Sequence, residues 1–387
     1  MDFNLRDRTI LLVVGGSRAY GIHLPTSDVD VKGVGIATAA YYHGYLAKWE
    51  QAEGAHMAAF ADTLTPEETM AMEGTKLEGT VYDLRKFVSL AADANPNILD
   101  VLFCRDEEVR VTSKLGDKLR EHRDLFLSAK AKHTFSGYAA SQLKRIKGHR
   151  AWLLNPPDHQ PTRKEFDLPE NTLIPADQLM AAQAAVQKQL DSWEFDFSGM
   201  NDAEIIHVTE QVKAYMTETL AFLGYPNPEE AKWLAAARKV GLDANLIYVM
   251  QKEREYEAAS RYWKQFQDWK KNRNEARAEL EAKYGYDTKH AGHLVRLLKM
   301  GREILETGKV HVWRGAGGPG DAEEIRAIRN GAWEYDKLIE WAEAEDNALE
   351  QMYRERKYVV AKQPDRNAIN KLCIELVETA LSEGVLR

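Results

Sequence analysis

The stretch VVGGSRAYGIHLPTSDVDVKGV, residues 13–34, holds the pattern that decides the first part of the fold. A Gly-Gly-Ser turn comes first, and Asp28 and Asp30 follow it, one residue apart. The apolar run at residues 8–14 predicts a buried strand that ends at the glycines, and the alternation at residues 29–37 predicts a second strand. Because side chains at i and i+2 of a strand point to the same side, the two carboxylates would lie side by side.

Two neighbouring carboxylates repel each other unless a cation lies between them, and their oxygens suit Mg²⁺. Proteins usually bind Mg²⁺ together with substrate phosphates. The turn fits this chemistry, because Gly15 and Gly16 let backbone N–H groups approach an anion and a helix beginning at Ser17 adds its positive end. The pattern therefore favours a triphosphate site beside a divalent-metal site, and with it phosphoryl or nucleotidyl transfer. The alternative is an edge strand with two solvated aspartates after a glycine turn.

The composition is that of a globular chain without membrane segments. Its 387 residues are 44% hydrophobic and 29% charged, with a net charge of −8. No apolar run approaches the roughly 18 residues of a membrane-spanning helix. The start, MDFNLRDRTILLVVGG, predicts a first strand rather than a signal peptide. Cys104 and Cys373 are the only cysteines, so no disulfide partner and no cysteine zinc site are expected, and the chain is predicted to be cytoplasmic.

The pattern along the chain changes near residue 115. Residues 1–115 predict an α/β domain with a third strand at 79–84, and residues 116–387 predict a largely helical region. The segment at 155–175 carries five of the twelve prolines and predicts an extended connection. Residues 251–284 predict one long charged helix, either solvated or serving as a partner-binding arm.

A site with two metal ions usually needs a third carboxylate on a strand next to the aspartate pair. Asp83 is the preferred candidate because it ends the short third strand, and Glu78 and Asp100 are the alternatives. Asp83 also precedes the helical segment LRKFVSL, so it is a candidate N-cap of that helix. The two roles can coexist.

Two groups of basic residues are candidates for phosphate contacts. Residues 125–157 contain no acidic residue and predict a patch that contacts a triphosphate or an RNA backbone, or else a basic helix face balanced by acidic helices elsewhere. The second group falls on one face of an amphipathic helix that Asp287 is expected to cap, where it would neutralise pyrophosphate. The candidates are Lys144, Arg145, Lys147 and Arg150 in the first group, and Lys289, His293 and Arg296 in the second.

Two further motifs are weaker. His290 and His293 are three residues apart, but no further ligands follow in a metal-like pattern, so zinc is not expected there. The glycine-rich segment WRGAGGPGDAEEI, residues 313–325, lacks the Gly-Lys-Ser/Thr end of a P-loop. It predicts a plain connection or a mobile lid.

The string GGSRAYGIHLPTSDVDVKGV resembles the signature of the DNA polymerase beta-type nucleotidyltransferase superfamily. Its fuller form, with Ala-Tyr-Gly, Ser-Asp and Lys-Gly-Val, is similar to a narrower family of bacteria and phages, the RNA-repair-pathway DNA polymerase beta family. Residues 155–283 match that family poorly and predict an enlarged helical section. The other similar segments are YYHG at 41–44, VYDLRKFVSLAADANPNILDVLF at 81–103, TFSGYAASQLKRIKGHR at 134–150, YDTKHAGHLVRLLKMGREILETG at 286–308 and IRNGAWEYDKLIEWAE at 328–343.

The resemblance implies an α+β fold in which a polymerase-beta-like nucleotidyltransferase domain with a mixed sheet precedes a largely helical C-terminal region. It implies Asp28 and Asp30 as catalytic metal ligands, and it adds Asp83 by strand order only. The nucleotide-binding residues expected from the turn and from the later helix together are Gly15, Gly16, Ser17, Arg18, Lys289, His293 and Arg296.

The implied reaction is transfer of a nucleoside monophosphate from an NTP, such as ATP, to an acceptor hydroxyl, with release of pyrophosphate. Two Mg²⁺ ions, for which Mn²⁺ can substitute, would assist it. The implied acceptor is an RNA 3′ end in RNA repair, with tRNA as one candidate. The alternatives are transfer to a protein or small-molecule hydroxyl, and a nucleotide-binding regulator without turnover.

Overall fold

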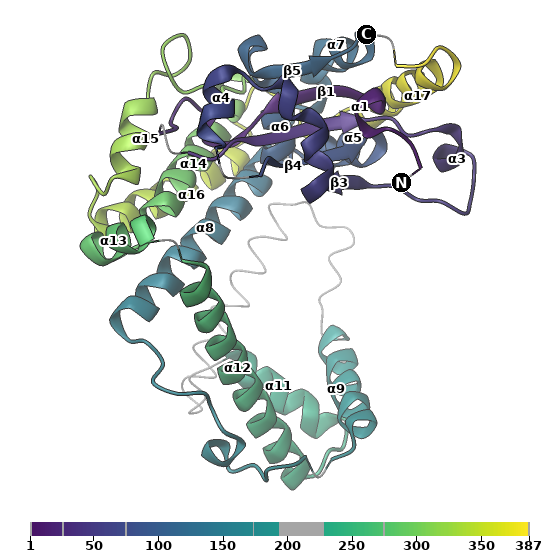
Figure 1. The fold of residues 1–387 in the computed structure, drawn as a ribbon. Helices are drawn as coiled ribbons and strands as arrows, with labels where there is room; N and C mark the ends of the chain where they lie inside the picture. Colours follow the sequence, from purple (N-terminus) through teal and green to yellow (C-terminus); the bar gives the residue numbers. More distant parts are fainter. Residues whose placement is uncertain are drawn as a thin grey trace. The chain divides into compact units, whose positions relative to one another are not determined.

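The computed structural model describes residues 2–24, 27–73, 76–172, 174–192, 228–273 and 275–385. The chain divides into two compact units (Figure 1). The first unit combines Met1–Leu153 with Glu275–Arg387, and the second unit is Leu154–Asn274. This division differs from the predicted boundary at residue 115, because residues 116–153 and 275–387 of the helical region belong to the same unit as the sheet.

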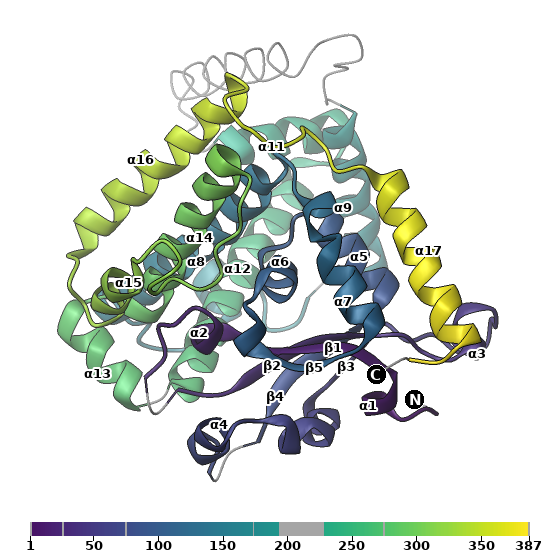
Figure 2. The same ribbon diagram turned by 90° about the horizontal axis from the view of Figure 1, so that it is seen from above.

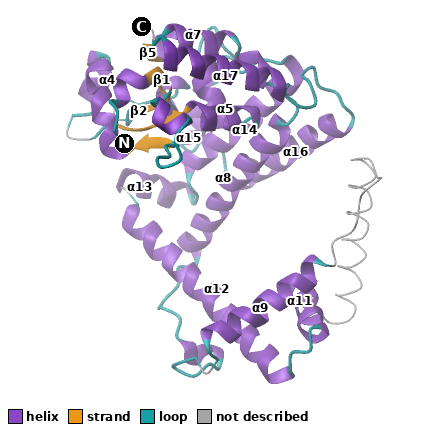
Figure 3. Ribbon diagram, turned by 90° about the vertical axis from the view of Figure 1, so that its right-hand side faces the viewer, coloured by secondary structure: helices purple, strands orange, loops and turns teal. Residues whose placement is uncertain are grey.

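The first unit is built around a five-stranded mixed sheet in the order β3-β4-β2-β1-β5. β1 pairs antiparallel with β2 and β5, β2 pairs parallel with β4, and β3 pairs antiparallel with β4. This sheet, followed by helices, confirms the predicted α+β class (Figure 3). The strands are β1 Thr9–Val14, β2 Asp30–Gly35, β3 Gln51–Glu53, β4 Glu78–Asp83 and β5 Val109–Thr112.

Every residue of β1 is buried, because both faces of the sheet are covered. Leu11 and Val13 join the larger core on one face, and Leu12 and Val14 join a smaller core on the other. α5, α6 and α7 lie on the first side and α4 lies on the second (Figure 2). The apolar run at residues 8–14 is therefore a strand buried on both faces, as predicted.

The larger core joins the sheet to the C-terminal helices. Twelve residues of α14 are buried, and eight of them share one apolar cluster with residues of β1 and β2. α14 ends with Gly308 in the left-handed conformation. The helices of the first unit are α1 Leu5–Arg8, α2 Gly16–Ala19, α3 Ala39–Tyr42, α4 Pro66–Ala71, α5 Leu84–Ala92, α6 Pro96–Phe103, α7 Lys114–Glu121, α8 Ala131–Leu154, α13 Glu275–Tyr284, α14 Thr288–Thr307, α15 Ala322–Arg329, α16 Tyr335–Arg354 and α17 Arg366–Ser382, with 3₁₀ helices η1 Gly54–Thr63, η2 Asp106–Glu108 and η3 Arg123–Phe126.

The second unit has a small core of its own. Val186 of α9, Trp233 of α11 and Met250 of α12 are among its buried members. The charged stretch at 251–284 is two helices rather than one, since α12 ends at Asn272. Of the predicted enlarged section, residues 193–227 lie outside the described residues. The helices of this unit are η4 Arg163–Phe166, α9 Ala176–Asp191, α11 Pro228–Lys239 and α12 Ala244–Asn272. No helix among the described residues is long and apolar enough to cross a membrane.

An arginine holds the start of the glycine-rich segment at 313–325 in the first unit. The side chain of Arg314 is 0% exposed and contacts Glu303 at 2.7 Å and Asp321 at 2.7 Å. Its backbone N–H donates to the carbonyl of Tyr20 at 3.1 Å. The beginning of this segment is therefore an anchored connection that packs beside α2.

Replacing Arg314 by Leu should lower the free energy of unfolding by about 3 kcal/mol, because it leaves two partly buried carboxylates without their counter-ion. The matched control is Arg326→Leu, whose half-exposed side chain pairs with Glu323 within one helix turn. That change should cost within about 0.5 kcal/mol. Urea unfolding followed by circular dichroism measures both. Equal effects of the two substitutions would contradict the anchoring role.

Candidate active site

The Gly-Gly-Ser turn lies directly against the carboxylate of Asp30. The N–H of Gly15 donates to the Asp30 carbonyl at 2.8 Å. Gly16 has φ +62°, and a Cβ placed there would stand 2.7 Å from Oδ2 of Asp30. Only glycine meets both conditions, because a side chain would be strained and would collide with the carboxylate. The turn and the aspartate strand are therefore built as one unit, with Ser17 half-buried at the start of α2.

Asp28 lies in the loop just before β2, so the predicted strand begins only at Asp30. Asp28 is exposed and Asp30, the first residue of β2, is half-buried. Burial and the neighbouring Asp28 carboxylate raise the pKa of Asp30 above its ordinary value. A site of this kind favours a divalent cation, since a cation would relieve both the burial cost and the repulsion.

The sheet register brings Glu78, and not Asp83, to this pair. In the parallel pairing of β2 and β4, Asp30 lies opposite Glu78, whereas Asp83 lies opposite Gly35. Residues opposite each other on neighbouring strands are about 5 Å apart. The charge of Glu78 also contributes to the raised pKa of Asp30, after burial and Asp28. Glu78 therefore replaces Asp83 as the candidate third carboxylate.

Asp83 has a different set of contacts at the far end of β4. Its Oδ1 accepts from the backbone N–H of Arg85 at 2.9 Å, which makes Asp83 the N-cap of α5. Its Oδ2 accepts from the hydroxyl of Tyr42 at 2.7 Å. The capping role considered for Asp83 is confirmed, and the structure does not bring this carboxylate to Asp28 and Asp30.

The basic face of α14 meets α2 beside the aspartates. The guanidinium of Arg296 lies 3.7 Å from the centre of the Tyr20 ring, and His293 lies edge-on to the same ring. Lys289 is exposed. Its positive charge acts to lower the pKa of Asp30, against the larger effect of burial. The three residues predicted from the helical spacing thus lie together on α14, more than 270 residues after the turn in sequence. Burial, and next the charge of Arg296, hold the pKa of His293 well below its usual range, so its imidazole is neutral at pH 7.

Asp100, on α6, contacts both Tyr20 and Arg296. Its Oδ2 accepts from the hydroxyl of Tyr20 at 2.6 Å, and its Oδ1 is 3.7 Å from the guanidinium of Arg296. All three side chains are buried. Asp100 is thus an ion-pair partner that joins α6, α2 and α14, and it is engaged in this contact rather than aligned with Asp28 and Asp30.

Lys32 is a further site residue that sequence reasoning missed. Its ammonium donates to Oδ1 of Asn97 at 3.1 Å, and its stem packs on Gly15. Burial lowers the pKa of Lys32, while the charges of Asp100 and Asp30 oppose this shift. The signal was present in the sequence, because the alternation DVDVK places Lys32 on the same strand face as Asp30.

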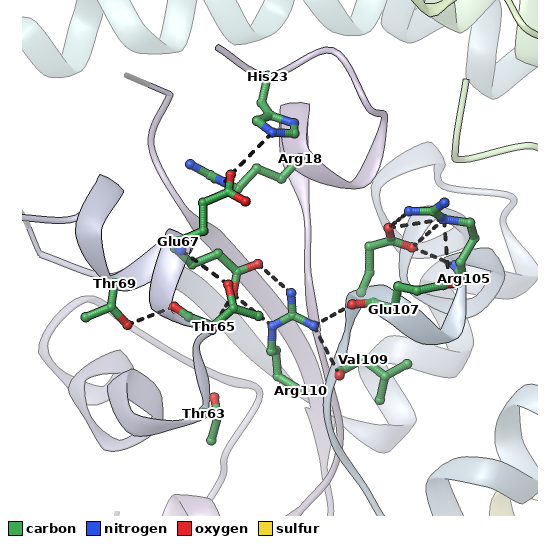
Figure 4. A network of polar contacts seen from close by, with 12 residues as sticks. Arg18, His23, Thr63, Thr65, Glu67, Thr69, Arg105, Glu107, Val109 and Arg110 are labelled. Atoms are coloured by element: carbon green, nitrogen blue, oxygen red, sulfur yellow. Dashed lines mark hydrogen bonds and ion pairs between the residues drawn. The ribbon is translucent and has the colours of Figure 1, made fainter. Parts of the chain in front are cut away.

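Arg18 supports the loop before Asp28. Its guanidinium donates to the carbonyl of Ser27 at 3.3 Å and contacts Glu67 at 3.3 Å. Glu67 also lies 3.8 Å from His23, and Figure 4 shows Glu67 of α4 beside Arg18 of α2 and His23 of the loop that follows α2. The side chain of Arg18 is buried, so these contacts position the aspartate loop. The structure does not present Arg18 as an open phosphate ligand.

The basic residues of α8 are not gathered at the aspartate pair. Arg150 donates to the carbonyl of Gly285 at 2.9 Å and lies over the ring of Tyr335. Lys147 is 3.7 Å from Glu343. Lys144 and Arg145 are exposed on the helix. Arg150 therefore holds the connection between α13 and α14, and the RNA-binding role of the other three stays a prediction.

Residues 4–154 match the RNA repair pathway DNA polymerase beta family. The match spans all five strands, the Gly-Gly-Ser turn and α8, and it confirms the resemblance inferred from the sequence. It points to a polymerase beta-like nucleotidyltransferase of RNA repair. No curated protein and no solved structure matches the chain.

The contact between Asp100 and Arg296 yields a test of how α14 is held at the site. Asp100→Asn should lower the free energy of unfolding by about 3 kcal/mol, because it leaves a buried guanidinium without a counter-charge. Asp106→Asn is the control, since this exposed carboxylate pairs with Arg120 at the surface and should contribute less than about 1 kcal/mol. Chemical denaturation compares the two. If Asp100→Asn left the free energy of unfolding unchanged, this ion pair would not be what holds α14 at the site.

Proposed function

We propose that the protein is a Mg²⁺-dependent nucleotidyltransferase that transfers a nucleoside monophosphate from an NTP to an RNA 3′ hydroxyl and releases pyrophosphate. One observation carries the proposal. The glycine turn packs on Asp30 so closely that an anion bound to the turn must lie beside the carboxylates of Asp28, Asp30 and Glu78. This juxtaposition of phosphate donors and metal ligands is what in-line displacement at phosphorus requires.

The residues present fit divalent cations of the Mg²⁺ or Mn²⁺ type. Their donor set is purely carboxylate oxygen, and Asp30 is half-buried beside two other acids. When bound, such cations stabilise the charge of the triphosphate and lower the pKa of the attacking hydroxyl. Asp28, Asp30 and Glu78 would hold them.

The remaining residues position the substrates. The N–H groups and the Ser17 hydroxyl of the turn would hold phosphate oxygens. The exposed ammonium of Lys289 would complement the leaving pyrophosphate, while Arg296 and Tyr20 keep α14 against α2. The proposal includes RNA as the partner and the cytoplasm as the location. Its support is the family match for RNA repair and the exposed basic residues Lys144 and Arg145.

The reaction is tested by supplying each α-³²P-labelled NTP with Mg²⁺ to a mixture of cellular RNA and protein. Label should enter RNA, and Asp28→Ala/Asp30→Ala should reduce it by at least about 100-fold, because charge stabilisation at the phosphates is lost. The control Asp106→Ala/Glu107→Ala removes two exposed carboxylates elsewhere and should keep the activity. Label on protein alone would show that the acceptor is a polypeptide. Nucleotide binding without any transfer would indicate a regulator, and full activity of the double variant would refute the metal site.

A second pair of substitutions separates the two candidate third carboxylates. Glu78→Gln should weaken Mn²⁺ binding and reduce transfer, with little effect on stability because Glu78 is exposed. Asp83→Ala should lower the free energy of unfolding by about 1 kcal/mol through loss of the α5 cap and leave Mn²⁺ binding unchanged. Mn²⁺ titration by electron paramagnetic resonance and urea unfolding measure these effects. If the Asp83 variant lost Mn²⁺ binding and the Glu78 variant kept it, Asp83 would be the metal ligand instead.

A further inference from the structure

A second group of metal-ligating side chains lies where α8, α13 and α14 meet, away from the carboxylates of the active site. His149 comes from α8, and Asp287 and His290 come from the start of α14. Nδ1 of His149 is 3.1 Å from Oδ2 of Asp287, and Nε2 of His290 is 3.5 Å from the same oxygen. One ligand atom from each of the three residues lies within 4.8 Å of those from the other two.

A further carboxylate lies beside this group. Oε1 of Glu281, on α13, is 3.9 Å from Nδ1 of His149. The side chains of Glu281 and Asp287 are 1% and 0% exposed, and those of both histidines are largely buried. Two imidazoles and the Asp287 carboxylate thus converge in the interior of the first unit, with Glu281 next to His149.

The spacing of these atoms is that of ligands around one tetrahedral ion. Zn²⁺ binds nitrogen and oxygen at about 2.0–2.1 Å, so two of its tetrahedral ligands stand about 3.3 Å apart. The separations of 3.1 and 3.5 Å between Oδ2 of Asp287 and the two imidazoles lie around this value.

The surrounding contacts hold the ligands in place. Oδ1 of Asp287 accepts the backbone N–H of His290 at 3.1 Å, which leaves Oδ2 directed at both imidazoles. Arg150 donates to the carbonyl of Gly285 and so fixes the connection that carries Asp287. Trp152 stacks on His149 with ring centres 5.5 Å apart. Such outer contacts orient the ligands of protein metal sites.

We propose that His149, His290 and Asp287 form a site for one divalent transition metal ion of the zinc class. Imidazole nitrogens favour such ions over Mg²⁺, which prefers oxygen ligands alone. Three protein ligands leave the fourth position of a tetrahedral ion to a water molecule. The ion would join α8 to the start of α14, one turn before His293 and beside Lys289. It would therefore hold the basic face of α14 at the active site.

The site also shows why the histidine spacing in the sequence was misleading. His293 faces Tyr20, whereas His290 turns toward Asp287 and His149. The second histidine ligand comes from a helix 138 residues away from Asp287. Zinc was not expected because the sequence neighbours of His290 do not include that ligand.

The test measures zinc in the full-length chain, purified without a metal-affinity tag and desalted after incubation with Zn²⁺. Mass spectrometry of the metal should find about one tightly held Zn²⁺ per chain. His149→Gln/His290→Gln should weaken its binding by more than the about 10–100-fold typical of losing an outer-shell contact. The control His122→Gln/His133→Gln, which removes two other histidines, should keep the ion.

Two further arms separate this site from the carboxylate site and guard against misfolding. Asp28→Asn/Asp30→Asn should retain the tightly held Zn²⁺, so this result is independent of the proposed transferase activity. In the unaltered chain, Zn²⁺ should protect His149 and His290 from modification by diethylpyrocarbonate, and Co²⁺ should give the visible absorption of a tetrahedral site. An unaltered chain that holds no Zn²⁺ after desalting, or Zn²⁺ lost from the aspartate variant and kept by the histidine variant, would overturn the proposal.

Discussion

The close approach of Gly16 to the Asp30 carboxylate is the constraint on which the rest of the site depends. A side chain at Gly16 would stand 2.7 Å from that carboxylate, so the turn can meet β2 only through bare backbone. The hydrogen bond from the N–H of Gly15 to the carbonyl of Asp30 holds the turn against the same residue. The glycine turn and the acidic residues, which we propose to hold phosphate and metal, are therefore brought together by the pairing of β1 with β2.

Charge around Asp30 is balanced by residues from distant parts of the chain. Asp28 and Glu78 raise the pKa of Asp30, while Lys32 and Lys289 lower it, and burial outweighs each of them. The arrangement leaves a local excess of acid directed at the turn. Such an excess is costly in an isolated protein and favourable once cations and a triphosphate are bound, which is how binding sites differ from the rest of a core.

The position of α14 rests on a buried polar contact within the apolar core. Tyr20 and Arg296 both engage Asp100, so the helix that carries Lys289 and His293 is tied to the helix of the glycine turn. At the N-terminal end of α14, the cluster around Asp287 ties the same helix to α8. Apolar packing alone would tolerate small shifts of α14, whereas directed contacts at both places define where its basic face lies.

Local sequence patterns determined the elements of this protein, and tertiary structure decided which of them meet. Strand and helix periodicity, which acts over a few residues, determines the apolar run of β1 and the face shared by Lys289, His293 and Arg296. The choice of Glu78 over Asp83 depends on the parallel register of β2 and β4, and the pairing of His149 with His290 depends on packing between distant helices. Neither register nor helix packing has a local signature, because both arise from contacts between segments far apart in the chain.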